Sequence, residues 1–114
     1  MLDLSNIRQI SGGDESFVKG ILTIFLSKEQ EYAEGITREL ANKNYDQLRQ
    51  VVHKIKSSIS VLGMNDFKKR LNELELGIEK GFYNETQIAE GATKALEEFG
   101  ESLKVVRAYL KAMR

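Results

Sequence analysis

Apolar residues recur along most of this chain at intervals of three, four and seven positions, which is the spacing of one face of an α-helix. The glycines mostly separate these periodic segments and proline is absent, so the pattern predicts long helices joined by short loops. A short helical segment is expected over residues 4–10. Long helices are expected over residues 15–42, over residues 44–63, from a cap at Asn65 or Asp66 to near Gly81, and from Asn84 towards the C-terminus.

Each expected long helix begins with a residue type that caps helices, and each carries one apolar stripe. The caps are Asp14, Asn44 with Gln47 three residues later, Asn65 or Asp66, and Asn84 with Gln87. The stripe of the first long helix is Phe17, Ile21, Ile24, Phe25, Tyr32, Ile36 and Leu40. The later stripes are Leu48, Val51, Val52, Ile55, Ile59 and Leu62; then Phe67, Leu71, Leu74 and Ile78; then Ile88, Ala92, Ala95, Leu96, Phe99, Leu103, Val106, Leu110 and Met113.

Short loops between consecutive long helices should make neighbours in sequence antiparallel neighbours in space. The expected fold is all-α: an antiparallel up-down-up-down four-helix bundle with a short extra N-terminal helix. Residues 1–114 are expected to form a single domain that is free-standing and acts as a monomer. A coiled-coil homodimer is the alternative, because the last helix keeps a near-heptad rhythm, but the other three helices offer enough apolar surface to cover that stripe.

The composition is that of an ordinary soluble globular protein, with 41% apolar and 30% charged residues. Seventeen basic residues balance seventeen acidic ones, so neither nucleic acid nor an anionic membrane is favoured as a partner. The absence of cysteine removes disulfides, thiolate catalysis and cysteine-ligated metals. No apolar run approaches the roughly 20 residues that cross a bilayer, and the start of the chain lacks the pattern of a secretion signal. The expected compartment is the cytoplasm.

His53, the only histidine, lies outside the apolar stripe of its helix. At about 100° per residue, the stripe falls within about 40° of one line, whereas His53 projects about 140° from that line. The imidazole should therefore face solvent. Its neighbours on this outer surface are the cationic Arg49 and Lys56 and the small Ser57 and Ser60.

Several kinds of chemistry can be weighed for this ring. A metal site is disfavoured, because the chain has no second histidine or cysteine and Gln50 stands where a di-iron bundle has glutamate. General-base catalysis with Ser57 would need a cleft and an oxyanion site that an open helix face does not offer. Covalent chemistry remains, because a neutral imidazole is a nucleophile. Phosphoryl transfer fits best, since Lys56 at i+3 and Arg49 at i−4 are within reach of a group carrying roughly two negative charges.

The segment His53-x-x-Lys56-Ser57-Ser58, followed by Leu62-Gly63, resembles the motif of the histidine-containing phosphotransfer (HPt) domain. That motif is written His-x-x-Lys-Gly-Ser, with a further glycine beyond the serine. Ser57 departs from it, because the family's glycine leaves space beside the phosphohistidine; activity is expected to survive with altered rates. The opening run is also similar to the start of such domains, through Leu4, Ile7, Gly12, Gly13, Asp14, Phe17 and Phe25.

The resemblance implies a phosphorelay intermediate of two-component signalling without kinase activity of its own. His53 would carry a phosphoryl group between aspartyl-phosphate receiver domains of response regulators, Lys56 would balance its charge, and Ser58 and Gly63 would keep the helix and its end in shape. Magnesium is expected on the receiver, and neither metal nor cofactor on this chain. An upstream hybrid histidine kinase is expected, because the sequence has no nucleotide-binding glycine loop. The alternative is a non-catalytic module that docks a receiver domain without phosphotransfer.

The docking face of HPt domains combines the histidine-bearing helix with the short first helix, which implies Ile7, Ile10, Arg49, Gln50 and Ser60 here. The alternative for Ile7 and Ile10 is that they cap the end of the core. The basic run at residues 68–70 could steer an acidic receiver surface, although a short charge run is more often only a solvated face.

Overall fold

Helices account for every regular element of the computed structural model, which describes residues 2–113 and, of Asn6, the backbone only. The prediction of an all-α fold is therefore confirmed. In order, the elements are α1 (Ser5–Ser11), α2 (Glu15–Ser27), α3 (Glu29–Ala41), α4 (Tyr45–Ile59), the 3-10 turn η1 (Ser60–Leu62), α5 (Asn65–Glu79) and α6 (Glu85–Ala112).

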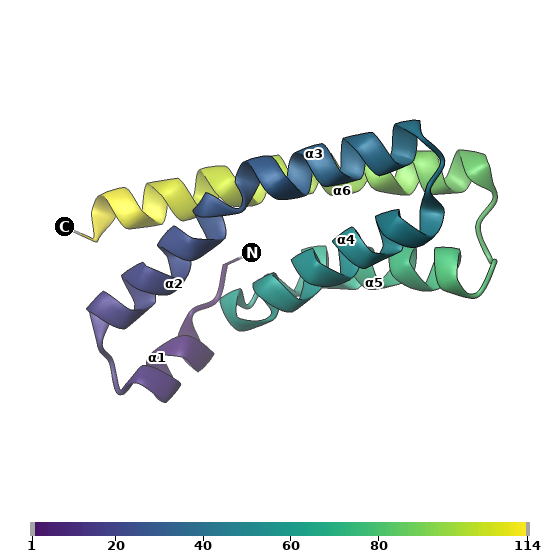
Figure 1. Ribbon diagram of the computed structural model, residues 1–114. Coiled ribbons are helices and arrows are strands. Elements are labelled where there is room, and N and C mark those ends of the chain that lie inside the picture. Colours follow the sequence, from purple (N-terminus) through teal and green to yellow (C-terminus); the bar gives the residue numbers. More distant parts are fainter. Residues whose placement is uncertain (1, 114) are drawn as a thin grey trace.

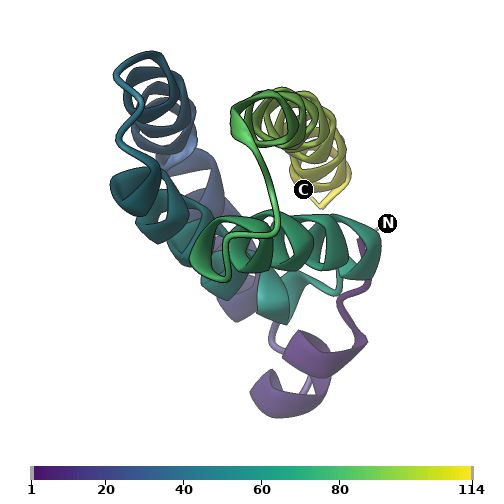
Figure 2. The same ribbon diagram turned by 90° about the vertical axis from the view of Figure 1, so that its right-hand side faces the viewer.

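Four of these helices form the bundle: α3 packs on α4, α4 on α5, α5 on α6, and α6 on α3. Figure 1 shows the chain direction alternating from each of them to the next, and Figure 2 views the bundle from one end. The 28 residues of α6 span about 42 Å at 1.5 Å per residue, close to the 44 Å length of the molecule. Short loops thus produce the predicted up-down-up-down bundle, with α1 as the extra N-terminal helix.

The expected single helix over residues 15–42 is wrong, because the chain bends at Lys28 and forms two helices. In a continuous helix, the Lys28 N–H would donate to the carbonyl oxygen of Ile24. Here the Ser27 hydroxyl donates to that oxygen (2.6 Å). The Lys28 N–H instead donates to the carbonyl oxygen of Phe25 (3.1 Å). Such back-bonding by a serine bends helices. The bend lets α2 leave the bundle and pack on α1 and on the far half of α6 (Figure 1).

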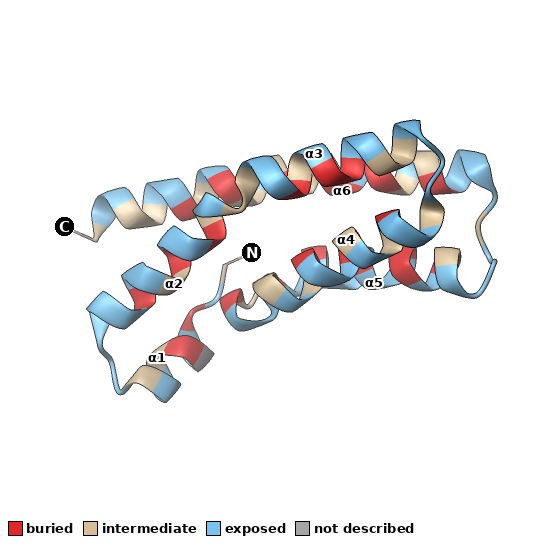
Figure 3. Cartoon of the chain, viewed as in Figure 1, coloured by how far each residue is buried: buried red, intermediate tan, exposed pale blue. Residues whose placement is uncertain are grey.

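The predicted apolar stripe of α2 is also wrong in part. Val18, Leu22 and Phe25 are buried, whereas Phe17 and Ile24 are 45% and 59% exposed. The prediction extended one helical line over residues 15–42, and the bend at residue 28 rotates the buried line of α2 relative to that of α3. The predicted stripes of the other helices do lie against the core, and the buried positions follow their inward faces in Figure 3.

Two predicted caps are confirmed, one is confirmed in position only, and one is wrong. The Asp14 carboxylate accepts from the N–H groups of Ser16 and Phe17, and Asn84 forms the predicted capping box with Gln87. Asn44 occupies the predicted N-cap position of α4, but its side chain makes no capping hydrogen bond; its amide instead donates to Glu39 Oε1 at 3.4 Å. The cap position of α5 is Met64, so Asn65 and Asp66 lie within the helix.

The α-helix that bears His53 was expected to run to Gly63 but ends at Ile59, and Gly63 ends the η1 turn that continues it. Its φ of +67° lies in the left-handed region, which favours glycine. The N-terminal segment also lies against it, since a Cβ at Gly63 would come within 2.2 Å of the Asp3 carbonyl oxygen. The Asp3 N–H donates to the carbonyl oxygen of Leu62 (2.9 Å). The end of the α4–η1 segment is thus tied to the start of the chain.

Candidate functional site

The His53 side chain projects from α4 towards solvent and is 56% exposed. Val52 and Ile55, its neighbours on the buried stripe, are fully buried. The ring is thus neither sealed under apolar packing nor held at both nitrogens, since both hydrogen bonds that it makes within residues 2–113 involve Nδ1. Nε2 is thus the ring nitrogen that no side chain or backbone group of these residues engages, on a ring that is 56% exposed.

Glu75 of α5 is the residue at this site that sequence reasoning missed. Its Oε2 lies 2.9 Å from His53 Nδ1, and its Oε1 lies 2.8 Å from Lys56 Nζ. The Lys56 ammonium also donates to Asn72 Oδ1 (3.1 Å). One carboxylate, with its side chain only 8% exposed, therefore joins the two side chains that the motif singles out.

The antiparallel packing of α4 on α5 brings these four residues together. His53 and Lys56 stand three positions apart on one face of α4, and Asn72 and Glu75 stand three apart on one face of α5. Because the two helices run in opposite directions, His53 meets Glu75 while Lys56 meets Asn72. The cluster is therefore set by the register of the bundle.

Opposing effects act on the Glu75 carboxyl. Burial raises the pKa of Glu75, but hydrogen bonds from Lys56 and His53, together with their charges, outweigh it and hold the pKa below its ordinary value. The carboxylate is thus the stable form. A carboxylate can only accept hydrogen bonds, so the His53 nitrogen facing it must carry a proton.

This geometry selects one tautomer of a neutral imidazole. With the proton on Nδ1 and directed at Glu75, the lone pair lies on Nε2 at the exposed edge of the ring. A lone pair on an accessible nitrogen is a nucleophile. The site can accordingly accept an electrophilic group at Nε2 while Glu75 keeps the ring oriented.

Arg49, which was expected to offset negative charge beside the imidazole, is engaged elsewhere. Its guanidinium binds Asp46 Oδ1 (3.1 Å). Asp46 precedes Arg49 by about one helical turn, so this contact points away from His53 along α4. Gln50 donates to the other oxygen of the same carboxylate (3.2 Å). The structure brings Lys56 to the His53 cluster and leaves Arg49 and Gln50 with Asp46.

The three serines that follow Lys56 lie in different surroundings. Ser57 is exposed, one turn after His53 on the same outer surface. Ser58 is half-buried, with its hydroxyl 2.8 Å from the Tyr32 hydroxyl of α3. Ser60 is exposed and donates to the carbonyl oxygen of Lys56 (2.9 Å). Ser58 thus links α4 to α3, while Ser57 and Ser60 are exposed.

The expectation that Ile7 belongs to a docking surface is wrong. Ile7 is only 2% exposed, because α1 packs this face against α2 and η1. Ile10 is 69% exposed, so its side chain is accessible to a docking partner. Within the basic run at residues 68–70, Arg70 forms an ion pair with Glu98 of α6, whereas the side chains of Lys68 and Lys69 are exposed.

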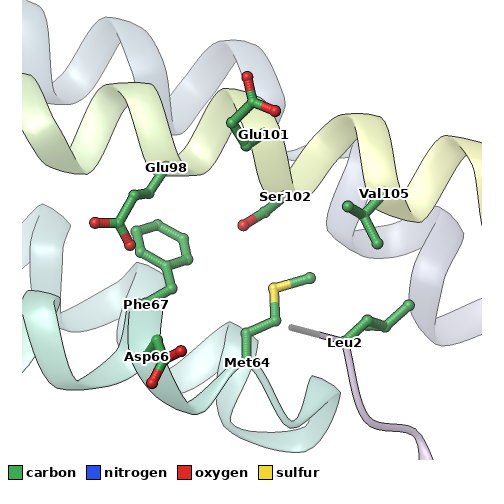
Figure 4. Close-up of a pocket in the computed structure, with 8 residues that line it drawn as sticks. All are labelled: Leu2, Met64, Asp66, Phe67, Glu98, Glu101, Ser102 and Val105. Atoms are coloured by element: carbon green, nitrogen blue, oxygen red, sulfur yellow. The ribbon is translucent and has the colours of Figure 1, made fainter.

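A pocket of about 240 Å³ lies between the start of α5, α6 and residue 2 (Figure 4). Figure 4 shows an apolar lining that includes Met64 and Phe67, with the Glu98 and Glu101 carboxylates beside it. None of the predicted site residues lines this pocket.

Within residues 2–113, no three histidine, cysteine or acidic side chains are grouped to hold a metal ion. The described helices include none with the length and apolar character of a membrane span.

The fold and the site define a small helical-bundle protein that presents one carboxylate-supported histidine to solvent. Residues 20–113 match the Hpt domain family, and the chain belongs to that family. Hpt domains take part in histidine phosphotransfer in two-component signalling and lack kinase activity of their own. No curated protein and no solved structure matches the chain. Because the family match begins at Gly20, the likeness of the opening run to such domains stays a prediction, apart from Phe25.

Proposed function

We propose that this protein is a phosphorelay intermediate that carries a phosphoryl group on Nε2 of His53 between aspartyl-phosphate receiver domains. The observation that supports this most directly is the 2.9 Å contact between Glu75 Oε2 and His53 Nδ1 on a ring that is 56% exposed. That contact leaves the nucleophilic nitrogen at the surface. A phosphorylated receiver is a chemically suitable donor, because an acyl phosphate has a good leaving group.

In the forward step, the Nε2 lone pair attacks the phosphorus atom of the receiver's aspartyl phosphate. A P–N bond forms, the P–O bond to the aspartyl oxygen breaks, and the aspartate leaves as a carboxylate. The proton on Nδ1 stays in place, so the ring gains positive charge next to the Glu75 carboxylate. Transfer to a second receiver reverses these bond changes. The magnesium ion that assists the transfer belongs to the receiver.

Lys56 supplies positive charge close to this reaction. In the structure its ammonium is bound to Glu75 and Asn72, and its side chain is 20% exposed. Lys56 thereby neutralises Glu75, so an incoming dianion meets a cluster without net negative charge. Its proposed role is charge compensation, exerted from its place beside Glu75.

The proposed docking surface for the receiver surrounds His53 and uses the exposed Ile10, Gln50, Ser57 and Ser60. An upstream hybrid histidine kinase supplies the first phosphoryl group through its own receiver, and response regulators are the further partners. We place the protein in the cytoplasm, where these partners act. Ser57 stands where the family motif has glycine. Its hydroxymethyl group is expected to narrow the space beside Nε2, and so to slow phosphoryl transfer without preventing it.

The test uses receiver domains labelled with radioactive phosphate and incubated with the purified chain. The expected product is a chain labelled with an alkali-stable, acid-labile phosphoryl group. His53→Gln should take no label, although its amide can still hydrogen-bond to Glu75. Lys54→Gln is the matched control, because Lys54 is exposed and points away from the imidazole; it should be labelled like the wild type. If receivers bind the chain but none labels it, the protein is instead a docking module without phosphotransfer.

A further inference from the structure

The Arg8 side chain ties the short helix α1 to two other helices. Its guanidinium forms an ion pair with Glu15 at the start of α2 and donates a hydrogen bond to the Tyr109 hydroxyl of α6. Arg8 Cζ also lies 5.8 Å from the centre of the Tyr109 ring, within the roughly 6 Å of a cation–π contact. Arg8 therefore connects α1, α2 and the C-terminal half of α6 at one point.

The position of α1 depends on side-chain contacts. The helix has only seven residues, and helices of that length are marginal unless they pack on other parts of the protein. The link from α1 to α2 contains Gly12 and Gly13, both with positive φ, and glycine restricts the backbone least. The packing of α1 on α2 and η1, together with the contacts of Arg8, must therefore set where α1 lies.

Ile10 lies on the side of α1 that faces away from the Arg8 contacts, because positions two apart on a helix are separated by about 160°. Ile10 is 69% exposed and belongs to the docking surface proposed above. The helix itself packs on η1, which begins at Ser60, about 10 Å of helix rise beyond His53. The contacts of Arg8 thus hold in place the helix that presents Ile10 to a partner arriving at His53.

We propose that Arg8 is a positioning residue for receiver binding, which holds α1 where Ile10 contacts the incoming receiver domain. The inference rests on the proposed function, because its partner is the receiver. Binding to a surface that is already ordered loses less conformational entropy than binding to one that must first be ordered. Loss of the Arg8 contacts should therefore weaken receiver binding and leave the chemistry at His53 unchanged.

Receiver binding to the full chain tests the proposal. Calorimetry gives the dissociation constant of an unphosphorylated receiver, and labelling by the phosphorylated receiver gives the maximal rate of transfer. Arg8→Gln should raise the dissociation constant by about three- to tenfold, the size expected for a lost surface ion pair and hydrogen bond. The maximal rate should stay within about twofold of the wild type, since His53 and Glu75 are unchanged.

Two further variants accompany Arg8→Gln. Tyr109→Phe removes only the hydroxyl that accepts from Arg8 and keeps the ring, so it should weaken receiver binding even where Arg8→Gln fails to fold. Arg107→Gln is the matched control, because Arg107 of α6 forms an ion pair with Glu29 of α3 and so joins two helices other than α1. This control should leave receiver binding unchanged.

A double-mutant cycle shows whether Arg8 acts through Ile10. Ile10→Ser alone should raise the dissociation constant, and adding Arg8→Gln to it should raise the constant by less than about twofold more, because the side chain that Arg8 positions is already gone. Amide hydrogen exchange of the free chain gives a readout that needs no receiver. The Gly13 N–H, which donates to the Arg8 carbonyl oxygen (2.9 Å) at the end of α1, should exchange faster in Arg8→Gln.

Three outcomes would each overturn the proposal: receiver binding that is unchanged in Arg8→Gln and Tyr109→Phe, effects of Arg8→Gln and Ile10→Ser that simply add, or exchange at Gly13 that stays as in the wild type. Failure of the proposed function is a different result, in which the wild type binds a receiver and takes no label. The dissociation constants would then still decide the role of Arg8. If no receiver binds the wild type, both proposals fall.

Discussion

Glu75 gives His53 and Lys56, the two side chains of α4 that the motif singles out, a shared partner. It is buried, yet its carboxylate reaches both His53 Nδ1 and Lys56 Nζ. Burying a carboxylate is unfavourable unless cations or donors compensate it. The cost is offset here because both partners donate to it. The ring orientation of His53 therefore depends on a residue of another helix.

Replacing Glu75 by Gln should slow phosphoryl transfer to His53 by about tenfold or more, because a neutral amide no longer selects the Nδ1–H tautomer. Ring nitrogen chemical shifts should change from one dominant tautomer to a mixture. Glu73→Gln is the control, since Glu73 is an exposed glutamate on the same helix, and it should leave both readouts unchanged. An unchanged rate in Glu75→Gln would mean that the carboxylate does not prepare the nucleophile.

At the residue scale, the sequence predicted the part of the site that lies on one helix. The helical wheel placed His53 outside the apolar stripe, and the spacing to Lys56 marked the motif. Glu75 was missed because its contact with His53 depends on how α4 and α5 pack, which no local spacing encodes. A signal was present, since Glu75 interrupts the apolar side of α5 between Leu74 and Ile78.

At the element scale, helices with clear local signals were predicted well. Asn84 and its capping box start α6, and Gly63 ends the η1 turn that follows the helix of His53. The bend at Lys28 escaped prediction because neither proline nor glycine marks it. At the bend, the Ser27 hydroxyl bonds to the Ile24 carbonyl. Asn44 failed as a cap because its side chain bonds to Glu39 instead.

Gly63 and Gly81 offer a matched pair for testing the end of the His53 helix. Both have positive φ, +67° and +73°, but a Cβ at Gly63 would strike the Asp3 backbone, while one at Gly81 would meet nothing within 4 Å. Gly81→Ala should lower the free energy of unfolding by about 1 kcal/mol. Gly63→Ala should lower it by about 2–4 kcal/mol.

Urea denaturation with both variants measures this difference. The excess loss in Gly63→Ala reports the contact between the end of the His53 helix and the N-terminal segment. Equal losses in the two variants would show that only the backbone conformation matters, and that Asp3 does not hold this end of the helix.

At the scale of the whole molecule, the stability should depend on the charge of Glu75. The pKa of Glu75 lies below its ordinary value of 4.5 in the folded chain. A lowered carboxyl pKa contributes stability that is fully present above the unfolded pKa and is lost as the pH falls through the folded pKa. The contribution of Glu75 should thus be complete at neutral pH and vanish in acid.

Glu75→Gln should accordingly be less stable than the wild type by about 1–3 kcal/mol near pH 7, because Lys56 loses its anionic partner and keeps only Asn72. The difference should shrink as the pH falls from 4.5 through the lowered pKa of the folded chain, because the unfolded carboxyl takes up its proton first and the folded carboxyl follows. Urea unfolding of both proteins at a series of pH values measures it. A difference that is constant down to about pH 3 would contradict the proposed ionised cluster.

The general architecture was accessible from sequence because apolar period and loop length largely determine a bundle. Stripes on four successive helical segments and short connections favour one antiparallel arrangement, which Figure 1 shows. The position of α2 was not accessible, since its buried line follows from packing against α1 and α6 after the bend. That misplacement is also why the exposed Phe17 and Ile24 were first assigned to the core.

The central claim is that Nε2 of His53 receives the phosphoryl group while Glu75 holds the proton on Nδ1. Correlated phosphorus and nitrogen NMR of the chain, labelled with nitrogen-15 and phosphorylated by a receiver, tests it most directly. The predicted result is phosphorus coupled to Nε2 of His53, with a proton on Nδ1. Phosphorus coupled to Nδ1, or a phosphoryl group on any other residue, would contradict it.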